Sequence, residues 1–179
     1  MSTTKILIAG FGGQGVLFAG KYLAYQGLLE GRQLSWLPSY GPEMRGGTAN
    51  CSVILSDEPV GSPIVTEPDV LIVMNLPSYD KYESSVVSGG LILLDSSLID
   101  RPTARSDVRT VRVPATAMAR EQGIPTLANM ILLGQFFACS GAADFANTDA
   151  VLKKVISQKH MDLFALNRKA LELGYHYQA

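Results

Sequence analysis

Three uninterrupted apolar runs stand out along the chain, and each predicts a buried strand. They lie in Ile6 to Ala9, in Val70 to Met74 and in Leu91 to Asp95, where the apolar residues are followed by the acid. Strands of a parallel sheet that is covered on both faces are apolar throughout, whereas half-exposed strands alternate between apolar and polar residues. We therefore predict these three segments as the central strands of a mostly parallel sheet.

Weaker patterns predict the remaining elements. Further strands are expected near Gln33 to Leu37, Thr48 to Leu55 and Val108 to Val113. Helical patterns cover Gln14 to Glu30, Ser78 to Val87, Ala115 to Gln122, Leu127 to Cys139, Thr148 to Ser157 and Met161 to Leu173. This order is typical of an α/β fold with a single doubly wound, Rossmann-like sheet, helices on both faces and, here, a helical C-terminal region. Because no repeat or low-complexity linker divides the chain, residues 1–179 are expected to form one domain.

The composition narrows the class of partner. The chain has 179 residues, with 15 Lys and Arg against 16 Asp and Glu, so no overall field attracts nucleic acid or an anionic membrane. Only 17% of the residues are charged, which hints at burial in a complex. Cys51 and Cys139 lie far apart, which argues against a zinc site or an iron–sulfur cluster. No apolar run approaches the roughly 20 residues of a membrane span, so a cytoplasmic protein is expected.

A glycine-rich turn follows the first apolar run. Gly10, Gly12 and Gly15 have the G-x-G-x-x-G spacing between a predicted strand and a predicted helix, which is the context of a dinucleotide-binding turn. Such a turn brings backbone N–H groups to a helix N-terminus, where the helix dipole favours a phosphate. The sequence therefore predicts an anion-binding turn.

Two features restrict which nucleotide this turn holds. Gly15 to Lys21 fits the G-x-x-x-x-G-K spacing of a nucleoside-triphosphate loop, but Tyr22 stands where a magnesium-binding Ser or Thr is needed. The acid that reads the ribose of NAD is expected at the end of the second strand. That strand instead runs into Pro38, and Glu30 precedes it at the close of the first helix. Ordinary NAD binding is therefore disfavoured.

The segment from Pro38 to Asn50 is unusual for a surface loop. Two prolines and three glycines restrict its backbone, while Tyr40, Glu43, Met44 and Arg45 project from it. It is either a rigid connection between two strands or a loop that presents these side chains to a ligand or partner.

At this point the sequence resembles a known family, the gamma subunit or gamma domain of the 2-oxoacid:ferredoxin oxidoreductases. The resemblance rests on motifs that occur in the family's order along nearly the whole chain. They are Gly10-Phe-Gly-Gly-Gln-Gly15, Pro38-Ser-Tyr-Gly-Pro-Glu-Met-Arg-Gly-Gly47, Ser62-Pro63, Pro68-Asp69, Met74-Asn75, Asn129-Met-Ile-Leu-Leu-Gly134 and Asn167-Arg-Lys-Ala-Leu-Glu-Leu-Gly174. The second motif is the most specific, and it looks slightly closer to the 2-oxoglutarate branch than to the indolepyruvate branch.

The resemblance implies one part of a hetero-oligomeric enzyme of EC 1.2.7 type. Such an enzyme oxidatively decarboxylates a 2-oxoacid such as 2-oxoglutarate on thiamine diphosphate. It passes electrons through iron–sulfur clusters to ferredoxin and delivers the acyl group to coenzyme A. Thiamine diphosphate and the clusters are expected on partner subunits, namely thiamine-binding alpha and beta subunits and possibly a ferredoxin-like delta subunit. The gamma part is expected to help bind coenzyme A, and a homodimer is possible when it is isolated.

Coenzyme A also fits the turn, because it carries a diphosphate and needs no acid at the second strand. No residue of this chain is predicted to be catalytic or to bind a metal. The candidate cofactor-binding residues are Gly10, Gly12, Gly13, Gln14, Gly15, Ser39, Tyr40, Arg45, Asn75 and Asn129.

Several of these roles stay open. Arg45 is either a phosphate clamp or an interface ion-pair partner. Asn75 and Asn129 either bind a ligand or satisfy buried backbone groups, and His160 and His176 are expected to be solvated. For the whole chain, the alternatives to a coenzyme A-binding subunit are a purely structural assembly subunit and a stand-alone dinucleotide-binding oxidoreductase.

Overall fold

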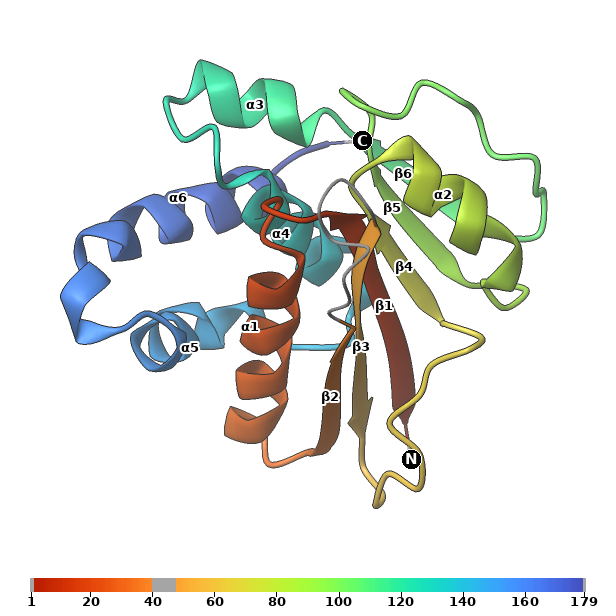
Figure 1. The fold of residues 1–179 in the computed structure, drawn as a ribbon. Coiled ribbons are helices and arrows are strands. Elements are labelled where there is room, and N and C mark those ends of the chain that lie inside the picture. Colours follow the sequence, from red (N-terminus) through yellow and green to blue (C-terminus); the bar gives the residue numbers. More distant parts are fainter. Residues whose placement is uncertain (1, 40–47, 179) are drawn as a thin grey trace.

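A computed structural model describes residues 2–39 and 48–178, and it has an α/β architecture around one sheet (Figure 1). The sheet has six strands in the order β2-β3-β1-β4-β5-β6. The strands are β1 (Thr3–Phe11), β2 (Gln33–Ser39), β3 (Thr48–Ser56), β4 (Val70–Val73), β5 (Leu91–Asp95) and β6 (Arg109–Val113). The α-helices are α1 (Val16–Leu29), α2 (Leu76–Tyr82), α3 (Ala115–Glu121), α4 (Ala128–Ser140), α5 (Thr148–Val155) and α6 (Asp162–Tyr175).

The three strands predicted to be central are confirmed, since β1, β4 and β5 each have a neighbour on both sides. The pairings β1–β4, β4–β5 and β5–β6 are parallel. Strand β3 is antiparallel to both β1 and β2, so it separates β1 from β2. The register aligns Ser39, Asn50, Ala9 and Val73 in one row. This row lies at the carboxyl ends of β1, β2 and β4.

Helices cover both faces of the sheet, but unequally. One face packs against α1 and α4, and α5 and α6 form an outer layer beyond them (Figure 1). The other face packs against α2, where Tyr79 is completely buried beside Leu71 and Ile92. Full burial of an aliphatic or aromatic side chain contributes about 1.5–3 kcal/mol. The apolar strand runs are thus explained by contact with helices on both sides.

Helix α4 contacts α6 at two glycines that end the two C-terminal sequence motifs. A Cβ atom at Gly134 would overlap the carbonyl oxygen of Leu171, and one at Gly174 would overlap that of Ile131. The backbones therefore approach more closely than any side chain permits. This contact fixes how α6 lies on α4.

In the part of the chain that the structure describes, we find no helix with the length and apolar character that crossing a membrane requires.

Candidate functional site

The glycine-rich turn lies between the end of β1 and the start of α1. Gly13 and Gly15 have φ angles of 91° and 75°, a region that favours glycine. Gly12 and Gly13 are exposed, whereas Gly10 is buried. A Cβ atom at Gly10 would lie 2.7 Å from Gln14 Oε1 and 3.1 Å from Met74 Cβ. The glycines therefore allow a tight turn whose outer backbone is open to a ligand.

Gln14 holds this turn in place. Its Oε1 accepts a hydrogen bond from the backbone N–H of Phe11 at 2.6 Å, and its Nε2 donates to the carbonyl of Met74 at 3.1 Å. Both ends of the amide are thus engaged within the protein. Gln14 was predicted to bind cofactor, and its observed contacts give it the role of fixing the turn against the end of β4.

The N-terminus of α1 presents backbone N–H groups beside the turn. The first hydrogen bond of the helix runs from the N–H of Ala19 to the carbonyl of Gly15 at 3.0 Å. The preceding N–H groups have no intrahelical acceptor, as at any helix start. Together with the helix dipole they favour an anion.

The strand order also points to this edge of the sheet. Strands β1 and β4 are parallel neighbours, but α1 leaves β1 toward one face and α2 leaves β4 toward the other (Figure 1). Open α/β sheets bind ligands in the crevice at such a switch point, outside the carboxyl ends of the strands. The turn after β1 therefore occupies the favoured position for a ligand.

Asn75 lies at the same edge, directly after β4. Its Oδ1 accepts a hydrogen bond from the N–H of Ser78 at 2.9 Å and so caps α2. Asn75 is 2% exposed, and its Nδ2 has no partner among the described residues. A buried donor without a partner costs free energy unless a ligand or water satisfies it. Asn75 therefore combines a structural role with a free donor near the turn.

Asn129 contacts the turn from α4. Its Nδ2 donates to the carbonyl of Gly15 at 3.1 Å, while its Oδ1 has no partner among the described residues. Asn129 and Gly15 both line a cavity of about 330 Å³ between α1, α4 and α6. Two distant motifs of the sequence thus meet at this turn.

The remaining predicted residues are placed differently. Ser39 is exposed at the end of β2, where it pairs with Asn50 of β3. Tyr40 and Arg45 lie outside the described residues, so their predicted roles stay predictions. The structure therefore brings together the turn, Asn75 and Asn129, with Ser39 two strands away from β1.

The features that argued against other nucleotides lie away from the turn or inside α1. Glu30 follows the last residue of α1, at the end of that helix remote from the turn, and accepts hydrogen bonds from Gln26 Nε2 and the N–H of Asp144. Gly20 and Lys21 lie within α1, where Gly20 packs closely against Cys51. Neither Glu30 nor Lys21 is positioned to read a nucleotide at the turn.

The sequence analysis did not single out Asp95, which ends β5 at the same edge. It is completely buried and accepts hydrogen bonds from Thr116 Oγ1 at 2.5 Å, the N–H of Thr116 at 3.1 Å and the N–H of Ser97 at 3.0 Å. The signal in the sequence that could have identified Asp95 is its position directly after an apolar run. Its contacts are all internal, and they hold the start of α3 to the sheet.

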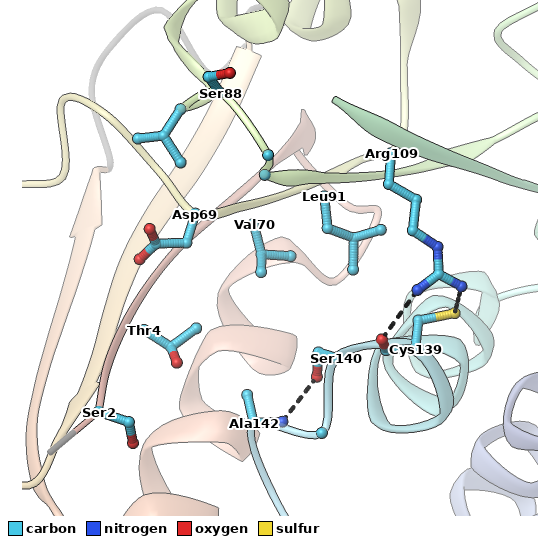
Figure 2. A pocket seen from close by; sticks show the side chains of 14 residues that line it. Ser2, Thr4, Asp69, Val70, Ser88, Leu91, Arg109, Cys139, Ser140 and Ala142 are labelled. Atoms are coloured by element: carbon cyan, nitrogen blue, oxygen red, sulfur yellow. Dashed lines mark hydrogen bonds between the residues drawn. The ribbon is translucent and has the colours of Figure 1, made fainter. Parts of the chain in front are cut away.

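A second cavity, of about 530 Å³, lies at the opposite edge of the sheet (Figure 2). Figure 2 shows Arg109 reaching from β6 to the C-terminal end of α4, where it contacts the carbonyl of Cys139 at 3.3 Å and Sγ at 3.8 Å. Asp69 on the opposite wall accepts from the N–H of Lys5 at 2.7 Å. This cavity lies at the amino ends of the strands, where open α/β sheets rarely bind ligands.

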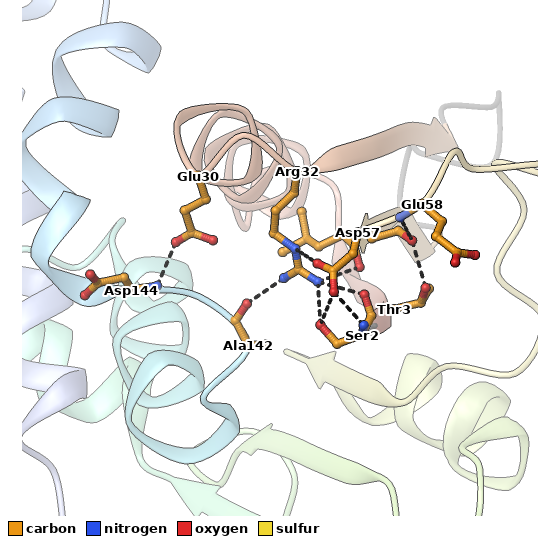
Figure 3. Close-up of polar contacts among 10 residues, drawn as sticks. Ser2, Thr3, Glu30, Arg32, Asp57, Glu58, Ala142 and Asp144 are labelled. Atoms are coloured by element: carbon orange, nitrogen blue, oxygen red, sulfur yellow. Dashed lines mark hydrogen bonds and ion pairs between the residues drawn. The ribbon is translucent and has the colours of Figure 1, made fainter.

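Near this edge, Arg32 connects four separate segments (Figure 3). Its Nη1 donates to the carbonyl of Ala142 at 2.9 Å, and its Nη2 donates to those of Ser2 and Leu55, each at 3.2 Å. Its Nε lies 3.6 Å from Asp57 Oδ1. All of these partners belong to the protein itself, so this charged cluster serves the fold.

The turn from Gly10 to Gly15 contains no titratable side chain. Burial raises the pKa of the Cys51 thiol to about 12, although hydrogen bonds from Trp36 and the Gly20 backbone oppose the shift. Among residues 2–39 and 48–178, no three His, Cys, Asp or Glu side chains are grouped as a metal site requires. His160 and His176 are exposed, as predicted. The described part of the site therefore offers backbone N–H groups and the neutral amides of Asn75 and Asn129.

Comparison with known proteins now identifies the family. Residues 5–177 match the family described as pyruvate ferredoxin/flavodoxin oxidoreductase. The chain belongs to this family. It is also similar to the crystal structure of the keto/oxoacid ferredoxin oxidoreductase gamma subunit from Geobacter sulfurreducens, with a TM-score of 0.82, 28% identity and 96% coverage of both chains. The resemblance to gamma subunits and the α/β fold class are thereby confirmed.

Two curated relatives show how this family member compares in length. The chain is 42% identical to ketoisovalerate oxidoreductase subunit VorA of Methanothermobacter marburgensis over 95% of its own length, but it spans only 35% of that protein. It is 32% identical to 2-oxoglutarate synthase subunit KorC of Methanocaldococcus jannaschii, over 96% of this chain and 91% of that one. Gamma-type sequence thus occurs both as a separate subunit and as about a third of a longer chain.

Proposed function

We propose that this chain is the gamma subunit of a 2-oxoacid:ferredoxin oxidoreductase and contributes part of the coenzyme A site. The observation that carries the proposal is the exposed turn at Gly12 and Gly13, which leads into the N-terminus of α1 at the switch point of the sheet. This geometry suits a diphosphate. The missing ribose-reading acid is compatible with coenzyme A, whose ribose carries a phosphate.

In the proposed site, the backbone N–H groups at the start of α1 bind the diphosphate, and Gln14 keeps the turn in position through Phe11 and Met74. Asn75 Nδ2 supplies a further donor at the same edge. Ser39, Tyr40 and Arg45 are proposed to complete the site from the side of β2. These residues bind and orient coenzyme A, which receives the acyl group on its thiol.

The other parts of the reaction are proposed to reside on partner subunits. Decarboxylation on thiamine diphosphate belongs to the alpha and beta subunits. The iron–sulfur clusters of the partner subunits, a ferredoxin-like delta subunit among them, pass electrons to ferredoxin. The relatives are named for ketoisovalerate and for 2-oxoglutarate. Similar gamma chains thus accompany different 2-oxoacids, which favours selection of the acid by other subunits.

The test is Gly12→Val in the assembled enzyme. Gly12 is exposed and does not have a positive φ angle, so a side chain there blocks the approach of a diphosphate with little backbone strain. We expect a rise of about tenfold or more in the Michaelis constant for coenzyme A, equivalent to about 1.4 kcal/mol. Reduction of ferredoxin by the 2-oxoacid in a single turnover without coenzyme A should be unchanged.

Two results would contradict the proposal. Unchanged kinetics with coenzyme A would mean that the diphosphate does not bind at the turn and would favour a structural role for this chain. Normal coenzyme A binding with weaker subunit assembly would make the turn part of an interface. Size-exclusion chromatography of the variant complex separates these results.

A further inference from the structure

Strand β6 lies at one edge of the sheet, and β5 is its only neighbour among the described strands. In a parallel pair, alternate residues of a strand bond to the neighbour. The N–H of Arg109 donates to the carbonyl of Gly90 at 2.9 Å, and the register continues without interruption to Val113. Every second residue from Arg109 therefore bonds to β5. The backbone N–H and carbonyl groups of Thr110 and Arg112 point to the open side.

These backbone groups of Thr110 and Arg112 are left without a strand partner. No other backbone hydrogen bond involves them in the part of the chain that the structure describes. A row of unpaired N–H and carbonyl groups is a ready template for a further strand, and natural sheets usually cover or protect it. Peptides that bind by strand addition take their affinity from such main-chain groups. The open side of β6 is therefore suited to receive an extended segment.

A groove of about 590 Å³ lies along this open side. Its walls include β6 from Arg109 to Arg112, the last turn of α4 at Ala138 and Cys139, and Tyr177 after α6. Arg109 also lines the cavity drawn in Figure 2, so it borders both hollows. The groove thus adjoins the residues whose backbone groups are unpaired, and an added strand has room there.

The groove is positively charged. Its lining contains two arginines and, among the described residues, no Asp or Glu. The guanidinium of Arg109 contacts the carbonyl and sulfur of Cys139. That of Arg112 donates to the carbonyls of Ile99 and Arg101. Neither forms an ion pair with a described carboxylate, so the groove favours a segment that carries Asp or Glu.

We propose that the open side of β6 receives an extended, acidic segment of a partner subunit of the oxidoreductase, which adds a strand to the six-stranded sheet. Similar chains are subunits of larger enzymes, so part of this surface must contact other subunits. A second copy of this chain would bring its own Arg109 and Arg112 into the same groove, and like charges oppose that pairing. The inference goes beyond the proposed coenzyme A site and does not depend on it.

The first test uses Thr110→Pro in the reassembled complex. Proline removes the N–H that faces the groove, and an edge strand tolerates it where that N–H does not join the ladder. Thr110→Val is the matched control, because it keeps the N–H and the β-branched shape. Titration of the chain into the remaining subunits should give a dissociation constant about threefold to tenfold higher for Thr110→Pro. The value for Thr110→Val should be unchanged, and thermal melting of each variant checks that it folds.

The second test uses Arg109→Glu, which reverses one charge of the groove. A carboxylate at this position should repel an acidic strand, so the dissociation constant should rise about tenfold or more at low ionic strength. The rise should be smaller at high salt, because salt screens exposed charges. Arg120→Glu is the matched control, since Arg120 is exposed on α3 and does not line the groove. Its dissociation constant should change by less than about twofold.

Hydrogen exchange at single-residue resolution locates the added strand. Assembly should slow exchange of the Thr110 and Arg112 amides about tenfold or more, because both gain acceptors. The amide of Val111 already bonds to β5 and should change much less. A partner that lay over the face of the sheet would not produce this alternation. The partner segment that becomes protected at the same time should contain Asp or Glu.

Three outcomes would overturn the proposal. One is normal assembly of both Thr110→Pro and Arg109→Glu, and another is unchanged exchange at Thr110 and Arg112 on assembly. The third is a dimer of the isolated chain that Thr110→Pro dissociates, since the occupant would then be a second copy. If Thr110→Pro does not fold, Arg109→Glu and the exchange pattern decide. The coenzyme A proposal is tested separately, through the Michaelis constant of assembled Gly12→Val.

Discussion

At the scale of single residues, Gly13 and Gly15 provide the sharpest prediction. Both have positive φ angles, but a Cβ atom at Gly13 meets nothing within 4 Å, whereas one at Gly15 would lie 2.9 Å from Asn129 Cγ. Gly13→Ala should therefore cost only the left-handed strain, about 1–2 kcal/mol of unfolding free energy. Gly15→Ala adds overpacking of about 1–3 kcal/mol. Urea denaturation of both variants measures the difference, and equal losses would mean that Asn129 moves aside without cost.

The turn could be predicted because glycine spacing between a strand and a helix has few structural solutions. The prediction correctly placed Gly12 and Gly15 between the first strand and the first helix, whereas Gly10 lies within β1. The sequence could not show that Gln14 would bond to Met74, which is 60 residues away along the chain. Nor could it show that Asn167 would line a cavity with Asn129, because that requires α6 to pack on α4. Contacts that depend on distant segments are not encoded in local patterns.

At the scale of elements, the strand interiors were predictable and the strand order was not. Apolar runs predicted β1, β4 and β5, since full burial leaves a continuous signal in sequence. One helix begins earlier than predicted, because a capping side chain determines where it starts. The predicted helix at Ser78 begins at Leu76, because Asn75 accepts a hydrogen bond from the N–H of Ser78. The insertion of β3 between β1 and β2 depends on long-range antiparallel pairing, which leaves no local signature.

The contact between α4 and α6 should be intolerant of a single added carbon atom. Gly134→Ala and Gly174→Ala each place Cβ against a backbone carbonyl of the other helix. Backbone cannot move aside as a flexible side chain can, so we expect each variant to lose about 3 kcal/mol. For a chain of this size that lowers the melting temperature by about 6–12 °C. Gly61→Ala is the control, because nothing lies within 4 Å of a Cβ atom there, and similar melting of all three variants would disprove the close contact.

Glu83 joins α2 to the segment before β6 and makes a pH-dependent contribution to stability. Burial alone would raise its pKa, but hydrogen bonds from Thr103, the N–H of Ala104, Arg101 and Tyr79 lower it to about 2. An unfolded Glu has a pKa of about 4.3. The folded state therefore binds the proton less readily, so the stabilisation is present above about pH 5 and is lost as the pH falls toward 2.

Glu83→Gln tests this linkage. The variant should be less stable at pH 7, because a charged acceptor of four hydrogen bonds is lost. Its unfolding free energy should also fall less steeply than that of the unmodified protein between about pH 5 and 2. Glu67→Gln, at an exposed carboxyl, should leave the acid slope unchanged. Parallel slopes for Glu83→Gln and the unmodified protein would show that another carboxyl group dominates.

At the scale of the whole molecule, the structure divides its polar groups between two edges of the sheet. Among the described residues, Asn75 Nδ2 and Asn129 Oδ1 at the carboxyl edge have no hydrogen-bond partner, which favours ligand binding there. The amino edge carries Arg32, whose side chain is 12% exposed and whose guanidinium contacts several segments. When this guanidinium is removed, the backbone carbonyls that accept from it lose charge-assisted hydrogen bonds. Each such bond typically contributes about 1.5–3 kcal/mol to the free energy of unfolding.

Arg32 should therefore control whether the helical layer and the first strand unfold together. Arg32→Met keeps the apolar stem but leaves the carbonyls of Ala142 and Leu55 without this donor, so we expect a loss of about 3 kcal/mol. Arg32→Lys keeps one charge but cannot reach the same set of acceptors, so its loss should be intermediate. Because Arg32 also bonds to Ser2, amide hydrogen exchange should quicken in the first strand and in the segment around Ala142 together. Faster exchange in only one of these segments would show that Arg32 stabilises them separately, and coenzyme A binding should be preserved in both variants because the turn lies at the other edge.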